Sequence, residues 1–319
     1  MTFMDRRKFL TRVMSTGSGL YAAALSSNAL IQQPGNPASF FAVSLAEWSL
    51  HRTIQSGQMT NLDFPYVAKQ KYGIDTVEYV NSFFMDKANN ISYLNELLQR
   101  CNDNNVKNNL IMVDDEGPLG DPDDKKRRKA VENHYKWVEA AKYLGCASIR
   151  VNAYGDGSPE DIQSAAVDGL GQLAEFSAAQ NINVIVENHG GSTSNGDWME
   201  KLMKRVSGKN IGTLPDFGNF CIEYSSGPGR KCLSEYDRYK GVSQMMPFAK
   251  GVSAKTRDFD EKGNCAETDY FKMMRIVRDA GFKGYAGIEF EGKNCSEDEG
   301  IKKTKALLDK VSRELASEK

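Results

Sequence analysis

Histidine is scarce in this sequence, with 3 residues in 319, and net charge is nearly absent because 41 Lys and Arg balance 42 Asp and Glu. Three imidazoles exclude a metal site built from many histidines. A net charge of −1 provides no broad basic surface for nucleic acid. No Gly-rich phosphate-binding loop follows an early strand pattern, and no apolar run is long enough to span a membrane. The 40% hydrophobic content supplies a sizeable core and excludes a disordered chain.

The first 38 residues have the composition of an export signal. Arg6 and Arg7 precede Lys-Phe-Leu, and a short apolar stretch rich in small residues follows at 13–25. A basic start followed by such a stretch is typical of secretion, and the arginine pair indicates the twin-arginine type. We therefore expect a signal and linker at 1–38, a single domain at 39–319, a periplasmic location and membrane contact only during export. An ordinary amphipathic helix is the alternative interpretation.

Export would make disulfides available to the six cysteines. Cys221 and Cys232 flank a short loop that contains Gly-Pro-Gly, and we predict that they pair. Cys265 and Cys295 are a weaker candidate pair. Cys146 adjoins a strand pattern, which indicates a small buried apolar side chain.

Short apolar runs and helix-length periodic segments alternate after the signal. Eight runs have the length and composition of strands: 40–45, 74–80, 109–113, 147–152, 182–187, 211–216, 250–255 and 285–290. Segments between them have helical periodicity, among them 91–103, 128–144, 159–180 and 270–280. Eight strand–helix units predict an α/β fold, the (β/α)8 TIM barrel, which takes about 250 residues. The alternative is an open doubly wound sheet, which we disfavour because the phosphate fingerprint of that fold is missing.

Acidic residues follow the last strands of the predicted barrel, at the end where such barrels build their active sites. Glu187, Asp216 and Glu289 each close an apolar run. Alternation along a strand predicts three pairs that share a face: Glu187 with His189, Ser253 with Lys255, and Glu289 with Glu291. Clustered carboxylates repel one another unless protons or a cation neutralise them. We therefore predict a divalent metal site, since oxygen ligands favour Mn²⁺ or Mg²⁺ and an imidazole also admits Zn²⁺ or Co²⁺. Separate, exposed loop carboxylates are the alternative.

Several motifs, in this order along the chain, resemble the sugar phosphate isomerase/epimerase family of xylose isomerase-like barrels: GIDTVEYV, LGCASIRVNAYG, VENHGG, LPDFGNF, VSAK and GYAGIEFEG. That family holds a divalent metal with two Glu, an Asp and a His. The resemblance assigns these ligands to Glu187, Asp216, Glu289 and the position of Ser253. Serine stands where the family has the His of a His-x-Lys motif, so metal retention stays open, with His189 as a replacement ligand.

The resemblance also implies a chemistry. The metal would polarise the carbonyl of a sugar, so that a proton on the neighbouring carbon can be removed. Glu187 and Glu289 are then the acid/base pair, and Lys255 supplies positive charge or a proton at the developing oxyanion. His189 would exchange a proton with a hydroxyl. The expected substrate-binding positions are Trp48, His51, Glu78 and Asn152.

The expected partner is a small sugar or glycoside. A periplasmic location and the missing phosphate loop favour a non-phosphorylated sugar or keto-sugar. Two alternatives stay open: a 3-keto-glycoside lyase that uses the same enolisation before β-elimination, and a non-catalytic sugar-binding barrel. Related barrels include DNA repair endonucleases, but the basic run at 125–129 follows acidic residues and indicates a solvated helix start, so we expect no nucleic acid. A homo-oligomer is left open.

Overall fold

A computed structural model describes residues 39–227 and 229–318, so the signal predicted for 1–38 lies outside the described residues. Eight parallel strands form one sheet in the order β6-β5-β4-β3-β2-β1-β10-β9. Their bounds are β1 (Ala42–Ala46), β2 (Thr76–Val80), β3 (Lys107–Met112), β4 (Ser148–Val151), β5 (Asn183–Glu187), β6 (Ile211–Leu214), β9 (Val252–Thr256) and β10 (Tyr285–Phe290). Each of the eight predicted strands is present, within a few residues at either end.

The two outer strands of this order, β6 and β9, meet and close the sheet into a barrel. Parallel bridges join Thr213 to Ala249 and Asp216 to Ser253. Backbone hydrogen bonds from Ser253 N to Pro215 O (2.9 Å) and from Phe217 N to Ser253 O (3.1 Å) run across this seam. The (β/α)8 prediction is therefore confirmed, and the open doubly wound alternative is wrong.

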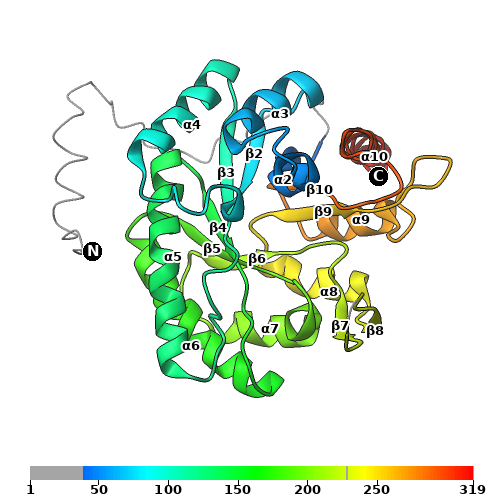
Figure 1. Cartoon of the computed structure of the whole chain (residues 1–319). Coiled ribbons are helices and arrows are strands. Elements are labelled where there is room, and N and C mark those ends of the chain that lie inside the picture. The colour runs from blue at the N-terminus through cyan, green and yellow to red at the C-terminus, as the bar shows by residue number, and fades with distance from the viewer. Residues whose placement is uncertain (1–38, 228, 319) are drawn as a thin grey trace.

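Helices surround the sheet, and most lie on its outer face (Figure 1). Their bounds are α2 (His51–Gln55), α3 (Phe64–Tyr72), α4 (Ile91–Asn104), α5 (Asp124–Leu144), α6 (Pro159–Ala178), α7 (Gly196–Arg205), α8 (Arg238–Met245), α9 (Tyr270–Asp279) and α10 (Glu297–Ser317). Short 3-10 turns are η1 (Glu47–Leu50), η2 (Asn61–Asp63), η3 (Asn81–Phe84), η4 (Gly191–Ser194) and η5 (Met246–Phe248).

The start of α5 shows why the basic run at 125–129 is a helix start. The Asp123 side chain accepts hydrogen bonds from the Lys125 and Lys126 N–H groups, which caps the helix. The helix ends at Gly145, whose left-handed backbone (φ 76°) suits a residue without a side chain. Most side chains of the run are exposed, as predicted.

Apolar side chains pack on both faces of the sheet. The larger core lies between the strands and the helices and includes Trp137, Phe64 and Leu97. A second group fills the interior of the barrel: Ala46, Val80, Leu110, Met112, Ile185 and Leu214. Trp48 and Phe83 pack against this inner group. The inner core therefore gives the carboxyl ends of the strands a solid apolar floor.

The cysteines follow the prediction in part. A disulfide joins Cys221 and Cys232, and it links β7 (Cys221–Tyr224) to β8 (Cys232–Glu235). These antiparallel strands form a hairpin outside the barrel, beside α8 (Figure 1). Cys146 is buried as expected. The pairing of Cys265 with Cys295 is wrong, since both are free and the Cys265 thiol instead donates a hydrogen bond to Glu267 Oε2 (3.1 Å).

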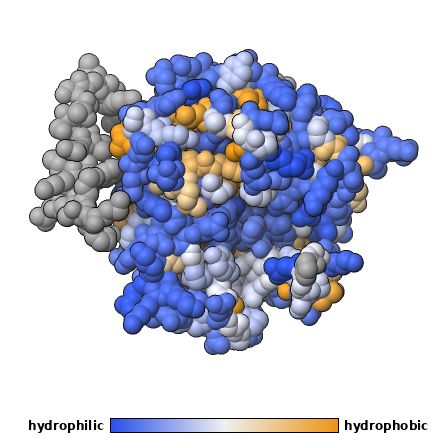
Figure 2. Space-filling view, in the orientation of Figure 1, coloured by the Kyte–Doolittle hydropathy of each residue, from blue (hydrophilic) through white to orange (hydrophobic). Residues whose placement is uncertain are grey.

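The surface in Figure 2 is largely hydrophilic, with apolar residues in small separate groups. Large exposed hydrophobic residues in the described part of the chain are Tyr66, Tyr154, Tyr224 and Leu233. Within the described residues, no helix combines the length and apolarity needed to cross a bilayer.

Candidate active site

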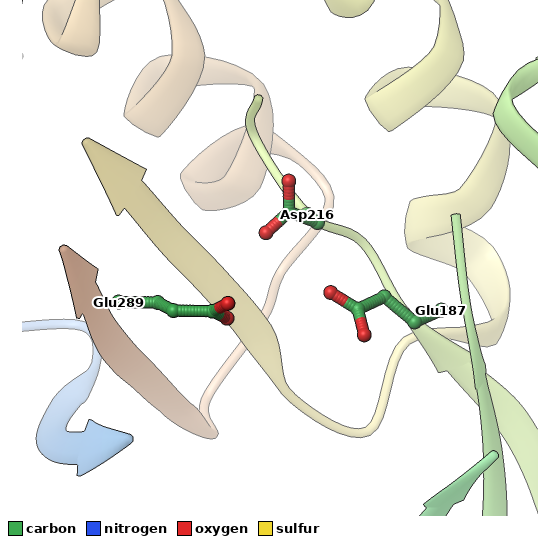
Figure 3. A group of neighbouring side chains, drawn as sticks. All are labelled: Glu187, Asp216 and Glu289. Atoms are coloured by element: carbon green, nitrogen blue, oxygen red, sulfur yellow. The ribbon is translucent and has the colours of Figure 1, made fainter. Parts of the chain in front are cut away.

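Three carboxylates from separate strands converge at the carboxyl end of the barrel (Figure 3). Glu187 is the last residue of β5, Asp216 lies two residues beyond β6, and Glu289 is in β10. One oxygen of each lies within 4.8 Å of the others, and the residues are 1%, 0% and 4% exposed. The sequence prediction that these residues cluster is confirmed, and the alternative of separate exposed carboxylates is wrong.

Asp216 is held by its local backbone. Pro215 ends β6, and the chain then turns so that Asp216 Oδ1 accepts hydrogen bonds from Gly218 N (2.8 Å) and Asn219 N (2.7 Å). The Asn188 side chain accepts from Asp216 N (2.7 Å) and donates to Asp216 O (3.0 Å). The first two bonds occupy Oδ1 and the other two fix the backbone of Asp216, so Oδ2 is the oxygen that contacts Ser253 and Lys255.

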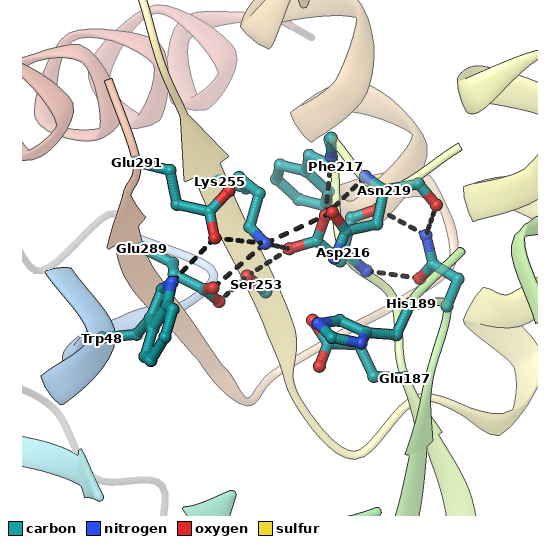
Figure 4. A network of polar contacts seen from close by, with 12 residues as sticks. Trp48, Glu187, His189, Asp216, Phe217, Asn219, Ser253, Lys255, Glu289 and Glu291 are labelled. Carbon is teal, nitrogen blue, oxygen red and sulfur yellow. Dashed lines mark hydrogen bonds and ion pairs between the residues drawn. The ribbon is translucent and has the colours of Figure 1, made fainter. Parts of the chain in front are cut away.

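Ser253 and Lys255 of β9 reach the same cluster, as strand alternation predicts (Figure 4). Ser253 Oγ lies 2.7 Å from Asp216 Oδ2 and 2.9 Å from Glu289 Oε2. Lys255 Nζ lies 3.0 Å from Glu289 Oε1, 3.5 Å from Glu291 Oε1 and 3.6 Å from Asp216 Oδ2. Burial opposes the charge of Lys255, but these carboxylates outweigh it and raise its pKa well above the usual value.

Arg150 of β4 is a site residue that the sequence reasoning missed. Its Nε lies 2.8 Å from Glu187 Oε2, and its Nη1 lies 2.6 Å from Asp114 Oδ1. Asp114 also accepts a hydrogen bond from Asn152 Nδ2 (2.7 Å). The sequence contained a hint of this role, because Arg150 stands between Ile149 and Val151 in a predicted strand, and a buried arginine is nearly always paired.

Protein groups contact each of the three carboxylates, but not equally. Two backbone amides hold Asp216 Oδ1, Lys255 holds Glu289 Oε1, and Arg150 holds Glu187 Oε2. Asp216 Oδ2 and Glu289 Oε2 share the single hydroxyl of Ser253. Both oxygens of Glu187 are buried without a hydrogen-bond partner, and Oε2 has only its ion-pair contact with Arg150. A buried acceptor left unpaired is costly, so this geometry favours an additional positive group.

The charges of the site are unequal. Two sets of ion pairs together join five carboxylates to three cations: Asp114 and Glu187 with Arg150, and Asp216, Glu289 and Glu291 with Lys255 and Arg257. With all five carboxylates ionised, the excess would be two negative charges, which one divalent cation would balance. Burial, together with the neighbouring carboxylates, raises the pKa of Glu187 well above its usual value despite Arg150.

The outer members of the network stay ionised. Burial opposes the charge of Asp114, but Arg150 outweighs it and lowers the pKa of this carboxyl to about 2. Burial likewise opposes the charge of Glu291, and Lys255 and Arg257 lower its pKa to about 2. A proton or a cation that neutralises the network would therefore bind at the central carboxylates, where burial raises the pKa values of Glu187 and Asp216.

His189 lies on the rim, in front of Glu187 (Figure 4). Its backbone N–H donates to Thr193 Oγ1 (2.9 Å). His189 is exposed, but partial desolvation and the charges of Arg150 and Lys255 lower its pKa to about 4, so the ring is neutral at pH 7. Among the described residues, the group that brings ligand atoms together contains no histidine, so the rotation of His189 into the metal site is not seen.

Trp48 forms one wall beside the cluster. Its indole N–H donates to Glu291 Oε1 (2.8 Å), and its ring stacks on Phe83 (5.8 Å between centroids) and on His51 (4.8 Å). His51 turns away from the carboxylates, because Nδ1 contacts Trp48 O (2.7 Å) and Glu297 Oε1 (3.6 Å). The structure thus brings Trp48 to the site and adds Phe83, while His51 supports the wall from behind.

Glu78 and Asn152 have different surroundings. Glu78 is 2% exposed and accepts hydrogen bonds from Ser44 Oγ (2.6 Å) and Asn109 Nδ2 (2.9 Å) inside the barrel. Burial raises its pKa to about 7. Asn152 lies at the rim, and its Oδ1 is buried without a partner after Nδ2 bonds to Asp114. An unpaired acceptor at this place suits a substrate hydroxyl. Both hydrogen bonds to Glu78 go to Oε1, and its Oε2 is likewise buried without a partner.

A separate surface cavity of about 680 Å³ lies near the amino end of β5, lined among others by Ala174, Asn183 and Asn210. It contains none of the charged residues of the network. The carboxyl end of the barrel is therefore the candidate active site.

Eight parallel strands closed into a barrel, with buried carboxylates at their carboxyl ends, define a TIM barrel with polar groups at the end where such barrels build their active sites. A family model described as the xylose isomerase-like TIM barrel matches residues 67–311, and the chain belongs to this family. A comparison with curated protein sequences found no significant match.

Three solved structures illustrate the similarity. The IOLI protein with a bound zinc atom is 14% identical with a TM-score of 0.65, over 86% of this chain and 98% of that one. A xylose isomerase-like TIM barrel protein from Mycobacterium smegmatis in complex with magnesium is 15% identical with a TM-score of 0.58, over 76% and 85%. The 3-keto-D-glucoside 4-epimerase YcjR from E. coli is 12% identical with a TM-score of 0.59, over 85% and 99%. At these identities the likeness shows the fold.

Proposed function

We propose that the protein is a sugar isomerase or epimerase that removes a proton from the carbon next to a carbonyl. The observation that carries the proposal is the convergence of Glu187 and Glu289 from different sides of the barrel mouth, with Lys255 beside them. Two carboxylates on opposite sides of a substrate carbon permit removal of a proton on one face and its return on the other. The epimerase among the similar structures supports the same class of reaction.

We assign a separate role in proton transfer or charge stabilisation to each of four residues of the site. Glu187 takes the proton on its carboxylate, neither oxygen of which accepts a hydrogen bond from the protein. Glu289 returns a proton from the opposite side. The Lys255 ammonium, which is fixed by three carboxylates, stabilises the negative charge that develops on the substrate oxygen. The neutral ring of His189 exchanges a proton with a neighbouring hydroxyl.

A divalent cation fits this site. The three oxygens that face one another come from Glu187, Asp216 and Glu289, and one of them lacks any hydrogen-bond partner. With all of its carboxylates ionised, the network would also carry two uncompensated negative charges. When bound, the cation would polarise the carbonyl and stabilise the oxyanion. An ionised carboxylate offers about four lone-pair sites, so an oxygen that contacts a cation can still accept a proton.

The substrate we propose is a non-phosphorylated sugar or keto-sugar. A phosphate group would meet an excess of negative charge in this site, whereas hydroxyls suit the unpaired Asn152 Oδ1 and Asn219 Nδ2. The Trp48 ring offers an apolar surface to the C–H face of a sugar.

Deuterium exchange tests the reaction. The purified protein with Mn²⁺ is incubated in D₂O with ketohexoses and 3-keto-glucosides, and NMR follows the proton next to each carbonyl. We expect exchange and an epimerised or isomerised product with at least one sugar. Glu187→Gln and Glu289→Gln should each abolish the exchange, and the exposed control Glu261→Gln should retain it.

Other outcomes decide between the alternatives. Release of the aglycone from a 3-keto-glucoside would support the lyase. Binding of a sugar without deuterium exchange, in the presence of each divalent cation, would refute catalysis and leave the non-catalytic sugar-binding barrel.

We also propose that the chain is exported through the arginine pair near its start. Arg6→Lys with Arg7→Lys should leave the protein inside the cell, whereas Lys8→Arg should not change its location. Immunoblots of the periplasmic and cytoplasmic fractions measure this, and export of the double variant would refute the role of the pair.

A further inference from the structure

Ser253 has a position that no other serine in the described chain shares. Ser253 is 1% exposed, and its hydroxyl lies between Asp216 Oδ2 and Glu289 Oε2. It belongs to the seam of the barrel, where its backbone bridges Asp216 directly. Its side chain therefore lies in the cluster by virtue of the strand register.

One hydroxyl proton cannot satisfy two carboxylates at once. Ser253 Oγ has a single O–H, yet two carboxylate oxygens approach it at 2.7 and 2.9 Å. Glu187, the third carboxylate of the cluster, accepts no hydrogen bond at either oxygen. The cluster thus has more acceptors than donors, and a cation that contacts several oxygens resolves this shortage.

Every group that faces the cluster and can ligate a cation is an oxygen. Three are carboxylate oxygens and the fourth is the Ser253 hydroxyl. Among the described residues, no imidazole or thiol joins this group. Oxygen ligands suit Mg²⁺, Mn²⁺ and Ca²⁺, whereas nitrogen and sulfur ligands raise the preference for Zn²⁺.

We infer that Ser253 is the fourth protein ligand of an all-oxygen site and that its hydroxyl sets the metal preference of this chain toward Mg²⁺ and Mn²⁺. This inference rests on the proposed function only for the presence of a divalent cation. It concerns the difference in affinity between hard and soft metals, which can be measured without knowledge of the substrate.

Isothermal titration calorimetry with Mn²⁺, Mg²⁺ and Zn²⁺ tests the inference on the full-length protein. The main variant is Ser253→Cys, which changes the ligand atom and little else. We expect the ratio of the Kd for Mn²⁺ to the Kd for Zn²⁺ to rise at least tenfold. Ser253→His should shift the ratio in the same direction. The titrations are run under argon without reductant, so that the Cys221–Cys232 disulfide stays intact.

Two further variants separate a ligand from a packing role. Ser253→Ala should weaken Mn²⁺ binding about three- to tenfold. Ser44→Ala is the matched control, because Ser44 is also buried in a strand and donates to a carboxylate, Glu78. Its metal affinity should equal that of the wild type. Thermal unfolding of each variant without metal shows whether it is folded.

The outcomes distinguish this inference from the proposed function. If the wild type binds Mn²⁺ and neither Ser253→Cys nor Ser253→His changes the ratio, the inference is overturned and the proposed function stands. If Ser253→Ala binds Mn²⁺ as tightly as the wild type, Ser253 is not a ligand, and the inference is overturned as well. If the wild type binds no divalent cation, both the inference and the metal-dependent form of the proposed function fail.

Discussion

Lys255 is the central cation of the site, and its removal tests the charge balance. The Lys255 side chain is 2% exposed and lies within 3.6 Å of oxygens of Asp216, Glu289 and Glu291. Lys255→Met keeps much of the volume but leaves these carboxylates without their main partner. Removing one member of a buried ion pair costs about 3–5 kcal/mol, because the remaining charge stays buried and uncompensated.

The structure gives this prediction a size. At about 2–3 °C per kcal/mol for a domain of this length, the melting temperature of Lys255→Met should fall by roughly 6–15 °C in the absence of divalent cations. The matched control is Lys302→Met, whose exposed pair with Asp298 should cost less than about 1 kcal/mol.

Addition of Mn²⁺ provides the second half of the test. A ligand at 100 times its Kd adds about 2.7 kcal/mol to the stability of the folded state. The variant has one more uncompensated negative charge than the wild type, so it should bind Mn²⁺ more tightly and gain more degrees. Differential scanning calorimetry with and without Mn²⁺ measures both effects. A melting temperature of Lys255→Met within about 2 °C of the wild type, without metal, would refute the charge-balance argument.

Three further predictions follow from other residues. Burial raises the pKa of Glu47 to about 8. Between about pH 4.5 and pH 8 the folded state therefore holds a proton that the unfolded chain has released, so the free energy of unfolding should fall as pH rises through this range. Glu47→Gln should make this pH dependence weaker, as measured by urea unfolding at several pH values. An unchanged pH dependence in Glu47→Gln would contradict the prediction. Replacing Cys221 and Cys232 with Ser should increase protease cleavage in the 225–231 loop. The melting temperature of the barrel should stay within about 2 °C of the wild type, because the hairpin lies outside the barrel. A larger fall in the melting temperature would show that the stability of the barrel depends on the disulfide. Trp48→Ala should weaken sugar binding about tenfold in calorimetry. Trp48→Phe should weaken it less, because the aromatic ring is kept and only the hydrogen bond to Glu291 is lost. Equal losses of affinity in the two variants would assign the effect to that hydrogen bond.

The barrel was predictable because strand and helix periods alternate along the whole domain. Glu187, Asp216 and Glu289 were predictable for a related reason: the carboxyl ends of parallel strands meet at one end of a barrel, so position along the strand implies position in space. Boundaries were less exact, as at Pro215, where the strand ends at Leu214 because proline lacks the N–H that pairing needs.

Pairing between distant side chains was harder to predict. Arg150 and Asp114 lie 36 residues apart, and only the register of β3 and β4 brings them together. The predicted pairing of Cys265 with Cys295 was wrong for a similar reason, because their positions depend on the conformations of two loops. His51 was expected to bind the substrate, but it begins α2, and its Nδ1 contacts Glu297 instead.

The seam between β6 and β9 has a consequence for how the barrel opens. Hydrogen bonds across it are few, and Asp216 and Ser253 lie on opposite sides. A cation or substrate that contacts both residues would fasten the two edges of the sheet to each other. Local opening of the barrel would then require release of the ligand. The rate of amide hydrogen exchange at Ser253 and Phe217 would therefore measure how long the ligand stays bound, although the ligand does not contact those amides.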